Sequence, residues 1–348
     1  MTNTIVYVSC AEDRVIERYR LDPERGRLTR LGTTEIPGAD APSATSPLAI
    51  SPDHRFLYAA LREEPNPVSS FAIAREDGAL RHLATAPLPA SMCYIETDRS
   101  GRWLLSASYF GAVVTVSPID ADGAVRRAPT QVVRTPPKAH CVLPDPSGRH
   151  VYAPCLGGDA VLGWEWDSNK GLVAPEQAQQ AALAAGAGPR HLAFSRDGRM
   201  AYVVNELDGT VTVFARDPDS GALMHRQTLP AITGHDAGKA AAADIHLSPD
   251  GRFLYASVRN DSHITVFTVS PTDGTLTQVE RLEVETTPRA FAIDPSGRFL
   301  ICAGKDAAAF GVYAIDPSSG RLARRERVAV GVNPNWVEII DLDRAPAG

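Results

Sequence analysis

Short apolar runs alternate with polar turns along the whole chain. In one clear unit, the apolar run Leu192–Phe194 is followed by a polar turn and then by two further runs, Met200–Val204 and Val211–Ala215. A turn containing Asp and Gly, Asp217–Leu223, leads into a fourth run. Runs of this length, rich in Val, Phe and Tyr and bounded by Pro, Asp, Ser and Gly, are typical of β-strands joined by hairpin turns. The pattern therefore predicts units of four antiparallel strands.

The first turn of each unit carries a recurring phrase that is rich in Ser, Pro, Asp and Gly and closes on an arginine. The six closing residues are Arg55, Arg102, Arg149, Arg199, Arg252 and Arg298. They stand 47, 47, 50, 53 and 46 residues apart, a mean of (298 − 55)/5. That mean is about 48.6 residues, and the chain is long enough for roughly seven such units. The sequence thus predicts an all-β fold, a seven-bladed β-propeller.

The two ends of the chain each supply part of a unit. The first 36 residues contain three predicted strands, Ile5–Cys10, Val15–Leu21 and Leu28–Ile36, with no apolar strand before them. Near the other end, Trp336–Ile340 is one predicted strand with none after it. We expect this C-terminal inner strand to pair with the three N-terminal strands and close the ring, because closure removes an exposed sheet edge. Residues 1–348 are then a single β-propeller domain.

Composition limits the cellular setting. Apolar residues make up 44% of the chain and charged residues 22%, as in ordinary soluble proteins. No apolar run approaches membrane-spanning length, and no leader pattern precedes the first strand. The five scattered cysteines are expected to be reduced, and the net charge of −6 comes without a basic block that would suit nucleic acid. We expect a cytoplasmic protein, a monomer or weak homodimer, without membrane or nucleic-acid partners.

Blade topology predicts where a binding site can form. In an antiparallel blade, the turns between strands one and two and between strands three and four lie on one rim of the ring. The turns between strands two and three, and the links to the next blade, lie on the other rim. The recurring Asp/Gly/Arg phrase belongs to the first rim and is interpreted as structural. A site should therefore form on the opposite rim, beside the central channel.

The inner strands carry ionisable residues where they begin on that second rim. Nine residues before the closing arginine stand His140, Arg190 and Arg289, and eight residues before it stand His191 and Asp244. The register seven residues before the arginine is wholly apolar, as packing between blades requires. Packing alone does not explain five ionisable groups in the two registers above it.

The loops between the second and third strands end on the same rim and add further polar side chains. They offer Arg62, Glu63, Tyr109, Asn205, Glu206, Arg259 and Lys305. His246, two residues beyond Asp244, is expected to face the channel. Several cations, a few carboxylates and two histidines at one channel mouth would attract a small anionic ligand and could move protons.

Four long blocks of sequence resemble one known family. They are ASYFGAVVTV (Ala107–Val116), GPRHLAFSRDGRMAYVVNEL (Gly188–Leu207), AADIHLSPDGRFLYASVRNDSHITVF (Ala242–Phe267) and PRAFAIDPSGRFL (Pro288–Leu300). The likeness runs from the first strand to NPNWVEI near the end of the chain and is to the seven-bladed propeller lactonases. That family is typified by bacterial 6-phosphogluconolactonase and is related to the fungal carboxymuconate lactonizing enzymes. The resemblance implies a hydrolase without metal or cofactor that opens a sugar lactone, 6-phosphogluconolactone, in the pentose phosphate route.

The resemblance also carries over particular residues. The positions regarded as functional in the family match His140, Arg190, Glu206 and Arg259 here, with His191, Asp244 and Arg289 close by. One departure concerns the loop of blade four, where typical bacterial members carry a lysine and this chain has Gly157 or Gly158. If that lysine holds a phosphate, the substrate here is a different lactone, unless Lys305 compensates.

The chemistry of the residues fits lactone hydrolysis, which needs an activated water, stabilisation of an oxyanion and a proton for the leaving alkoxide. We assign water activation to Glu206 or His191. Arg190 and Arg259 suit the oxyanion and the anionic part of the substrate, because a guanidinium is permanently charged and forked. The catalytic candidates are His140, Arg190, His191, Glu206 and Arg259. The candidates for substrate binding are Tyr109, Asn205, Asp244, His246, Arg289 and Lys305, and no metal ligand is predicted.

Other interpretations stay open at this point. Arg190 with Glu206, or Arg259 with Asp244, could be ion pairs that lock neighbouring blades. The chain could be a lactonizing or cycloisomerase enzyme acting on a carboxymuconate-like dicarboxylate or tricarboxylate. It could also be a non-catalytic propeller that binds proteins, although it lacks the GH and WD dipeptides of the WD40 class. A calcium-dependent propeller is disfavoured, because no cluster of Asp, Asn and Glu occurs at the inner-strand mouths.

Overall fold

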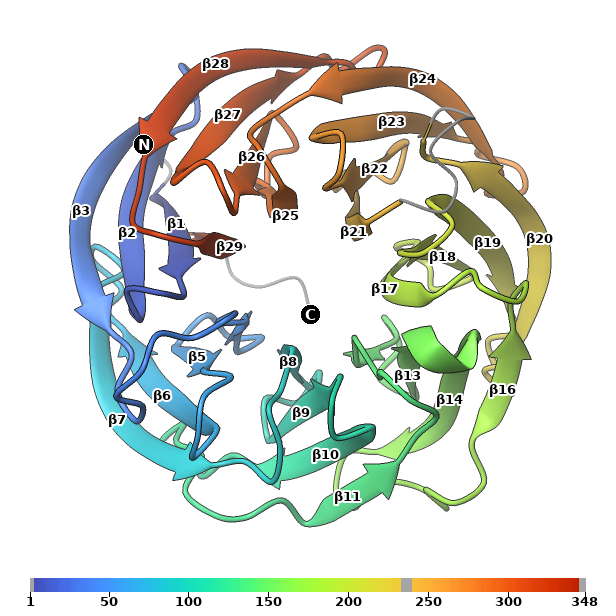
Figure 1. Ribbon diagram of the computed structural model, residues 1–348, viewed down its shortest axis with the longest axis horizontal. Helices are drawn as coiled ribbons and strands as arrows, with labels where there is room; N and C mark the ends of the chain where they lie inside the picture. Colours follow the sequence, from blue (N-terminus) through green and yellow to red (C-terminus); the bar gives the residue numbers. More distant parts are fainter. Residues whose placement is uncertain (1–2, 233–239, 344–348) are drawn as a thin grey trace.

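The computed structural model describes residues 3–232 and 240–343, whose strands form seven antiparallel sheets arranged as a ring (Figure 1). Each sheet is a blade with its first strand innermost, so the predicted seven-bladed propeller is confirmed. Within these residues the helical structure is one short 3-10 turn, η1 (Leu156–Gly158).

Five blades contain four strands in chain order. Their strands are β4 (Leu48–Ile50), β5 (Phe56–Ala60), β6 (Pro67–Ile73) and β7 (Leu80–Pro87); β8 (Tyr94–Thr97), β9 (Trp103–Ser108), β10 (Val113–Pro118) and β11 (Gln131–Arg134); β17 (Pro189–Phe194), β18 (Met200–Asn205), β19 (Thr210–Arg216) and β20 (Leu223–Pro230); β21 (Ala242–Leu247), β22 (Phe253–Val258), β23 (His263–Val269) and β24 (Leu276–Glu283); β25 (Pro288–Ile293), β26 (Phe299–Gly304), β27 (Ala309–Ile315) and β28 (Leu322–Ala329).

Blade four, which contains Gly157 and Gly158, has five strands, because two short strands pair with different parts of its third strand. Its strands are β12 (Leu143–Pro144), β13 (His150–Cys155), β14 (Ala160–Asp167), β15 (Gly171–Leu172) and β16 (Gln179–Ala182). β15 pairs with the end of β14 and β16 with its beginning. The outer edge of this blade is therefore shared between two segments.

The two ends of the chain complete the seventh blade. Its strands are β29 (Pro334–Asp341), β1 (Thr4–Cys10), β2 (Val15–Asp22) and β3 (Arg27–Glu35). β29 lies innermost and pairs antiparallel with β1, from Asp341 opposite Thr4 to Pro334 opposite Cys10. The predicted closure by a C-terminal inner strand and three N-terminal strands is confirmed.

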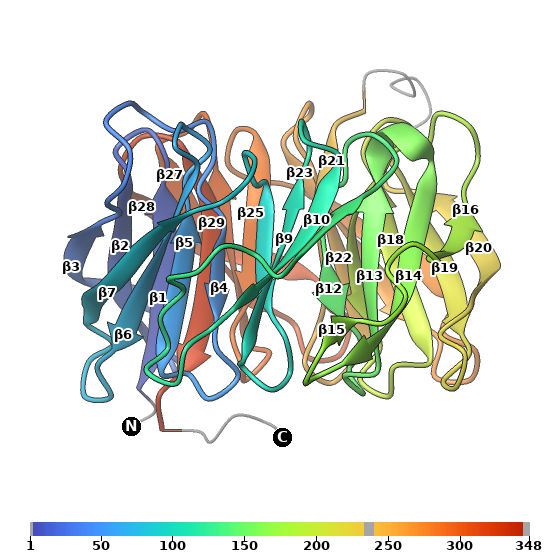
Figure 2. The same cartoon turned by 90° about the horizontal axis from the view of Figure 1, so that it is seen from below.

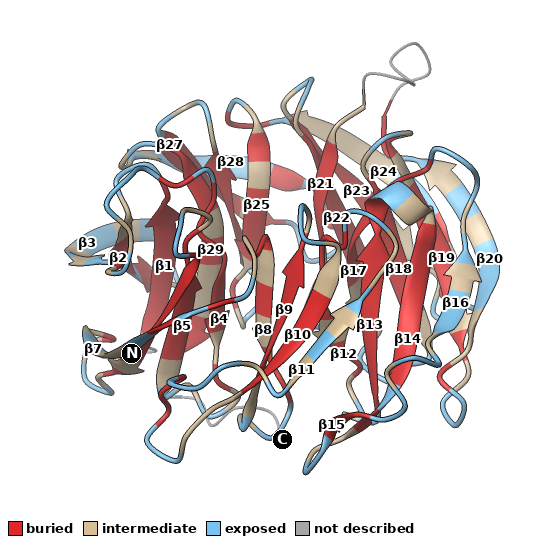
Figure 3. Cartoon of the chain, turned by 60° about the horizontal axis from the view of Figure 1, so that its bottom comes forward, coloured by how far each residue is buried: buried red, intermediate tan, exposed pale blue. Residues whose placement is uncertain are grey.

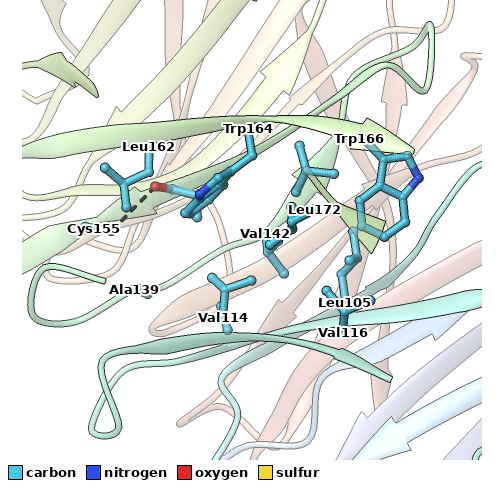
Figure 4. Packing of buried hydrophobic residues seen from close by; sticks show 13 residues of the cluster. Leu105, Val114, Val116, Ala139, Val142, Cys155, Leu162, Trp164, Trp166 and Leu172 are labelled. Carbon is cyan, nitrogen blue, oxygen red and sulfur yellow. Dashed lines mark hydrogen bonds between the residues drawn. The ribbon is translucent and has the colours of Figure 1, made fainter. Parts of the chain in front are cut away.

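The core lies between neighbouring blades. The buried apolar residues that the structure describes fall into seven clusters, one for each pair of adjacent blades. Figure 4 shows the cluster in which Leu105 and Val116 face Trp164 and Trp166. Side chains alternate along a strand, so each inner strand contributes to the clusters on both of its sides. Burial decreases towards the outer circumference of the ring, where outer strands such as β3 and β20 are largely exposed (Figure 3).

Buried tyrosines fasten successive blades to one another. In each of five blade pairs, a tyrosine on a second strand donates its hydroxyl hydrogen to the carbonyl of a turn glycine in the next blade. The pairs are Tyr7 with Gly78, Tyr58 with Gly123, Tyr152 with Gly221, Tyr202 with Gly274 and Tyr255 with Gly320. These glycines have φ between 71° and 85°, a conformation that side chains disfavour. The turn between the third and fourth strands is therefore a docking element as well as a connection.

The recurring Asp/Gly/Arg phrase forms tight turns on one face of the ring. In one copy, the carboxylate of Asp145 accepts hydrogen bonds from the backbone of Ser147, Arg149 and His150. These turns lie on the face where β29 ends, at the bottom of Figure 2. The turns between second and third strands and the links between blades lie on the opposite face, which we call the mouth face. The interpretation of the phrase as structural agrees with these bonds.

Candidate active site

Bulges on three successive inner strands aim ionisable side chains at the mouth end of the channel. The pairing of β17 with β18 skips Arg190, and the pairing of β25 with β26 skips Arg289. The pairing of β21 with β22 shifts in the same way around Asp244. A bulge leaves the extra residue outside the regular alternation of the strand and redirects its side chain, and bulges are common beside active sites. The repeated irregularity explains why the two registers at the mouth are polar.

Glu206 is the carboxylate that joins two of the arginines. Its Oε2 lies 2.9 Å from Nε of Arg190, and its Oε1 lies 3.1 Å from Nη2 of Arg259. Burial alone would raise the pKa of Glu206, but the two guanidinium charges outweigh it and hold that pKa below its ordinary value. Glu206 is therefore ionised at neutral pH. The ion pair between Arg190 and Glu206 matches one interpretation left open by the sequence, whereas Arg259 pairs with Glu206 rather than with Asp244.

His191 is held in one orientation from both sides. Its Nδ1 lies 2.8 Å from Oδ1 of Asp244, and its Nε2 lies 3.1 Å from Nη1 of Arg190. Because a guanidinium only donates, the Nε2 atom accepts and the ring proton sits on Nδ1, facing Asp244. Burial and the charge of Arg190 lower the pKa of His191 to about 4. The imidazole is consequently neutral at pH 7, with its lone pair turned towards the arginines.

Asp244 links the mouth to the channel below it. Its Oδ2 lies 3.2 Å from Nε2 of His246 and accepts the backbone N–H of Phe291, while Oδ1 also accepts that of Ile245. Burial alone would raise the pKa of Asp244, but His246 and His191 reverse this and hold it well below its ordinary range. In the opposite sense, Asp244 outweighs burial and raises the pKa of His246. His246 faces the channel, as the sequence predicted.

Aromatic rings surround the histidines. The ring centroid of His140 lies 5.3 Å from that of His191 and 5.7 Å from that of Tyr109. Tyr94 and Trp336 stand on the other side of His191, at 5.1 Å and 6.1 Å. His140 is buried, and its Nδ1 has no hydrogen-bond partner within the described ranges. Burial and the charge of Arg190 lower the pKa of His140 well below its usual value, so His140 is neutral as well.

Two of the predicted substrate-binding residues do not join this group. Asn205 is fully buried at the end of β18 and donates to the hydroxyls of Thr210 and Thr212 within its own blade. These bonds hold the β18–β19 turn that presents Glu206. Lys305 lies beside Asp306, with 3.7 Å between Nζ and Oδ1. That Lys305 holds a phosphate in place of a lysine in blade four stays a prediction.

The structure places three further ionisable residues beside the site: Arg62, which the sequence placed at the mouth without a role, and Glu96 and Glu338, which sequence reasoning passed over. Arg62, in the loop after β5, lies close enough to Arg289 to depress the pKa of its guanidinium, after burial and two other arginines. Glu96 and Glu338 line a cavity of about 380 Å³ in the channel, together with His246 and Trp336. Glu96 stands six residues before its closing arginine, in the same register as His246. That shared register was the signal available in the sequence.

Two further properties concern the described residues together. Among the described residues, no group of three or more His, Cys, Asp or Glu side chains is arranged to hold a metal ion. No helix formed by these residues is long and apolar enough to cross a membrane.

The ring of seven blades defines a β-propeller, and the mouth of its channel is polar and rich in arginine. A family model described as lactonase, 7-bladed beta-propeller, matches residues 5–339. The chain belongs to this seven-bladed propeller lactonase family. The family resemblance inferred from the sequence is confirmed.

Similar proteins carry consistent names. A 6-phosphogluconolactonase from Pectobacterium atrosepticum is 41% identical over 339 residues, which are 97% of this chain and 99% of that protein. A 6-phosphogluconolactonase from Serratia proteamaculans is 41% identical over 290 residues, 83% of this chain and 85% of its own. Among solved structures, the periplasmic gluconolactonase of Pseudomonas aeruginosa is 30% identical with a TM-score of 0.87, covering 98% of this chain and all of that one.

Proposed function

We propose that this protein is a metal-independent lactonase that hydrolyses 6-phosphogluconolactone to 6-phosphogluconate. The observation that carries the proposal is the mouth itself, where the neutral imidazole of His191, fixed by Asp244, stands against guanidinium groups that can hold an oxyanion. The near full-length similarity to proteins named 6-phosphogluconolactonase supports the choice of substrate. The guanidinium groups supply the positive charge that a metal ion supplies in other hydrolases.

The reaction follows from the positions of these groups. A water molecule takes the place of the Arg190 contact at Nε2 of His191, gives that nitrogen a proton and attacks the lactone carbonyl carbon. The guanidinium groups of Arg190 and Arg259 stabilise the oxyanion that forms. When the ring C–O bond breaks, the imidazolium returns its proton to the leaving alkoxide. The carboxylic acid product then ionises, so each turnover releases one proton.

His191 suits the role of general base better than Glu206. Both oxygens of Glu206 already face guanidinium groups, at 2.9 Å and 3.1 Å, and these charges weaken it as a base. The pKa of His191 is lowered by burial and by Arg190 and Arg289, and an anionic substrate on those arginines cancels part of this effect. Substrate binding therefore makes the imidazole more basic. A positioned general base contributes about 100-fold to 10,000-fold to the rate.

Acid release tests the proposal. Freshly prepared 6-phosphogluconolactone and gluconolactone are each mixed with the protein at pH 7, with and without a chelator, and proton release is followed against the spontaneous rate. We expect accelerated opening of the phosphorylated lactone that the chelator does not change. Absence of acceleration on both lactones, with turnover of a carboxymuconate, would assign the chain to the lactonizing enzymes instead.

The proposal also covers domain organisation, cellular compartment and binding partners. We infer that residues 1–348 act as one domain, since β29 and β1 hold the two chain ends in the same blade. The five free and buried cysteines favour a reducing compartment and hence the cytoplasm. The substrate is a small anionic sugar lactone. The partners do not include nucleic acid or a membrane. The protein is a monomer or weak homodimer. Size-exclusion chromatography with light scattering, and fractionation of the source cells, test these statements.

A further inference from the structure

The arginines at the mouth differ in how many of their donors are already used. Arg190 contacts Glu206, the carbonyl oxygen of Ala243 and His191. Arg259 donates through Nε to the carbonyl oxygen of Ala241, at 3.0 Å, and pairs with Glu206 through Nη2. Both guanidinium groups are therefore fixed in place by protein atoms, with only part of each fork free for a ligand.

Arg289 is in a different situation. It is half-buried at the start of β25, and within residues 3–232 and 240–343 the structure shows neither a hydrogen bond nor an ion pair to its guanidinium. Burial, together with the charges of Arg190, Arg259 and Arg62, lowers the pKa of Arg289 well below its ordinary value. A half-buried guanidinium without an acceptor, surrounded by like charges, is stabilised most by an anion.

Arg62 follows β5, in the blade that lies on the other side of the seventh blade from β25, and its charge acts on Arg289. Its Nε lies 3.2 Å from the hydroxyl of Ser91, and its guanidinium carbon lies 5.2 Å from the ring centre of Phe110. Phe110 is 77% exposed at the tip of the β9–β10 turn, so the ring supports the guanidinium from the solvent side. The ion pairs shown for Arg62, Arg190, Arg259 and Arg289 within the described residues all go to Glu206. The group thus carries an excess of three positive charges, four guanidinium groups less one carboxylate.

We propose that Arg62 and Arg289 form a subsite for a phosphate monoester, and that this subsite selects phosphorylated sugar lactones over their unphosphorylated counterparts. The inference rests on the proposed function and adds the residues that recognise the substrate. A phosphate monoester carries close to two negative charges at pH 7 and three acceptor oxygens, which match two forked guanidinium groups. Arg190 and Arg259, already bonded to Glu206, are left for the lactone carbonyl. No lysine in the loop of blade four is needed in this arrangement.

The test compares two substrates on three variants. Arg62→Met and Arg289→Met keep the apolar stem and remove the charge, and Arg81→Met does the same at an exposed site on β7. For each we measure kcat/KM with 6-phosphogluconolactone and with gluconolactone. We expect the ratio of the two values to fall about 10-fold to 100-fold in each of the first two variants, and to stay at the wild-type value in the third. The ratio is the readout, because removing Arg289 also relieves the lowering of the His191 pKa and so alters the rate on both lactones.

A second measurement does not depend on turnover. Inorganic phosphate is titrated into the wild type and into each variant by calorimetry, and 6-phosphogluconate is compared with gluconate as an inhibitor or ligand of the wild type. We expect phosphate binding that Arg62→Met and Arg289→Met each weaken at least 10-fold, and tighter binding of 6-phosphogluconate than of gluconate.

The outcomes separate the inference from the proposed function. Equal losses on both lactones, an unchanged ratio, or equal binding of 6-phosphogluconate and gluconate by the wild type would overturn the phosphate subsite while leaving lactone hydrolysis intact. A wild type that hydrolyses neither lactone overturns the proposed function. In that case, phosphate binding that depends on the two arginines still supports the subsite, and its absence refutes it.

Discussion

Replacing Glu338 by Gln should make the protein less sensitive to alkaline pH. Glu338 lies half-buried on β29 in the channel cavity, and one of its oxygens accepts a hydrogen bond from Nε1 of Trp336, at 2.8 Å. Burial, together with the nearby carboxylate of Glu96, raises the pKa of Glu338 to about 8. A glutamine keeps the shape of the side chain and the bond to Trp336, and it removes the charge. The substitution therefore isolates the cost of ionising this group inside the channel.

The magnitude follows from proton linkage. In the unfolded chain the carboxyl loses its proton near pH 4.5, and in the folded chain it keeps it up to about pH 8. Between these values the unfolded state binds fewer protons, so the free energy of unfolding falls as pH rises. The full difference corresponds to about 5 kcal/mol, and water in the channel screens the charge, which leaves about 2 kcal/mol. The variant should gain that amount over the wild type by pH 9 and nothing below pH 4.5.

Urea unfolding followed by tryptophan fluorescence at pH 4.5, 6, 7.5 and 9 gives the free energy of unfolding for both proteins. Glu35→Gln, at an exposed position on β3, serves as the matched control. The difference in the free energy of unfolding between this control and the wild type should be the same at all four pH values. A difference between Glu338→Gln and the wild type that stays constant from pH 4.5 to pH 9 would refute the reasoning. It would mean that the channel solvates this carboxylate as well as bulk water does.

Three further substitutions test the site and the ring. Asp244→Asn should lower kcat on the order of 100-fold or more, because a neutral amide stabilises the imidazolium of His191 less than a carboxylate does; an unchanged kcat would remove His191 from the mechanism. Arg190→Lys should also lower activity about 100-fold, since one ammonium cannot replace the fork that reaches both Glu206 and His191, and near-normal turnover would contradict that role. Tyr255→Phe should reduce the free energy of unfolding by about 1 kcal/mol without affecting kcat, and an unaltered urea midpoint would show that the bond to its turn glycine contributes nothing.

The ring could be predicted because its information is repeated. Six copies of the turn phrase set the period, and the incomplete units at the two ends could only be completed by each other. The strand bounds also followed closely, as in the predicted Val15–Leu21 against the observed Val15–Asp22. Repetition also marks the tyrosine, which stands three residues after the closing arginine at Tyr58, Tyr152, Tyr202 and Tyr255. It does not show that the hydroxyl bonds to a turn glycine of the next blade.

The site was less accessible than the ring for a physical reason. Residues on the inner strands could be placed by register, so His191 and Asp244 were predicted together and meet at 2.8 Å. Loop residues have no register, and their orientation depends on contacts that the sequence does not show. Asn205 therefore entered the prediction as a substrate-binding residue although it holds its own turn, and Arg62 was placed at the mouth but given no role although its charge acts on Arg289.

The mouth of the channel carries more positive charge than the cavity below it, and this difference favours the binding of an anion at the mouth. Arginines from several blades surround the mouth, whereas Glu96 and Glu338 line the cavity below. The guanidinium groups attract an anion to the mouth. Glu96 and Glu338, whose pKa values are raised to about 7 and about 8, add repulsion in the cavity only as the pH rises past these values. A sugar phosphate is then held at the level of His191 instead of descending past it. Asp244, bonded to His191 above and to His246 below, connects the mouth to the cavity.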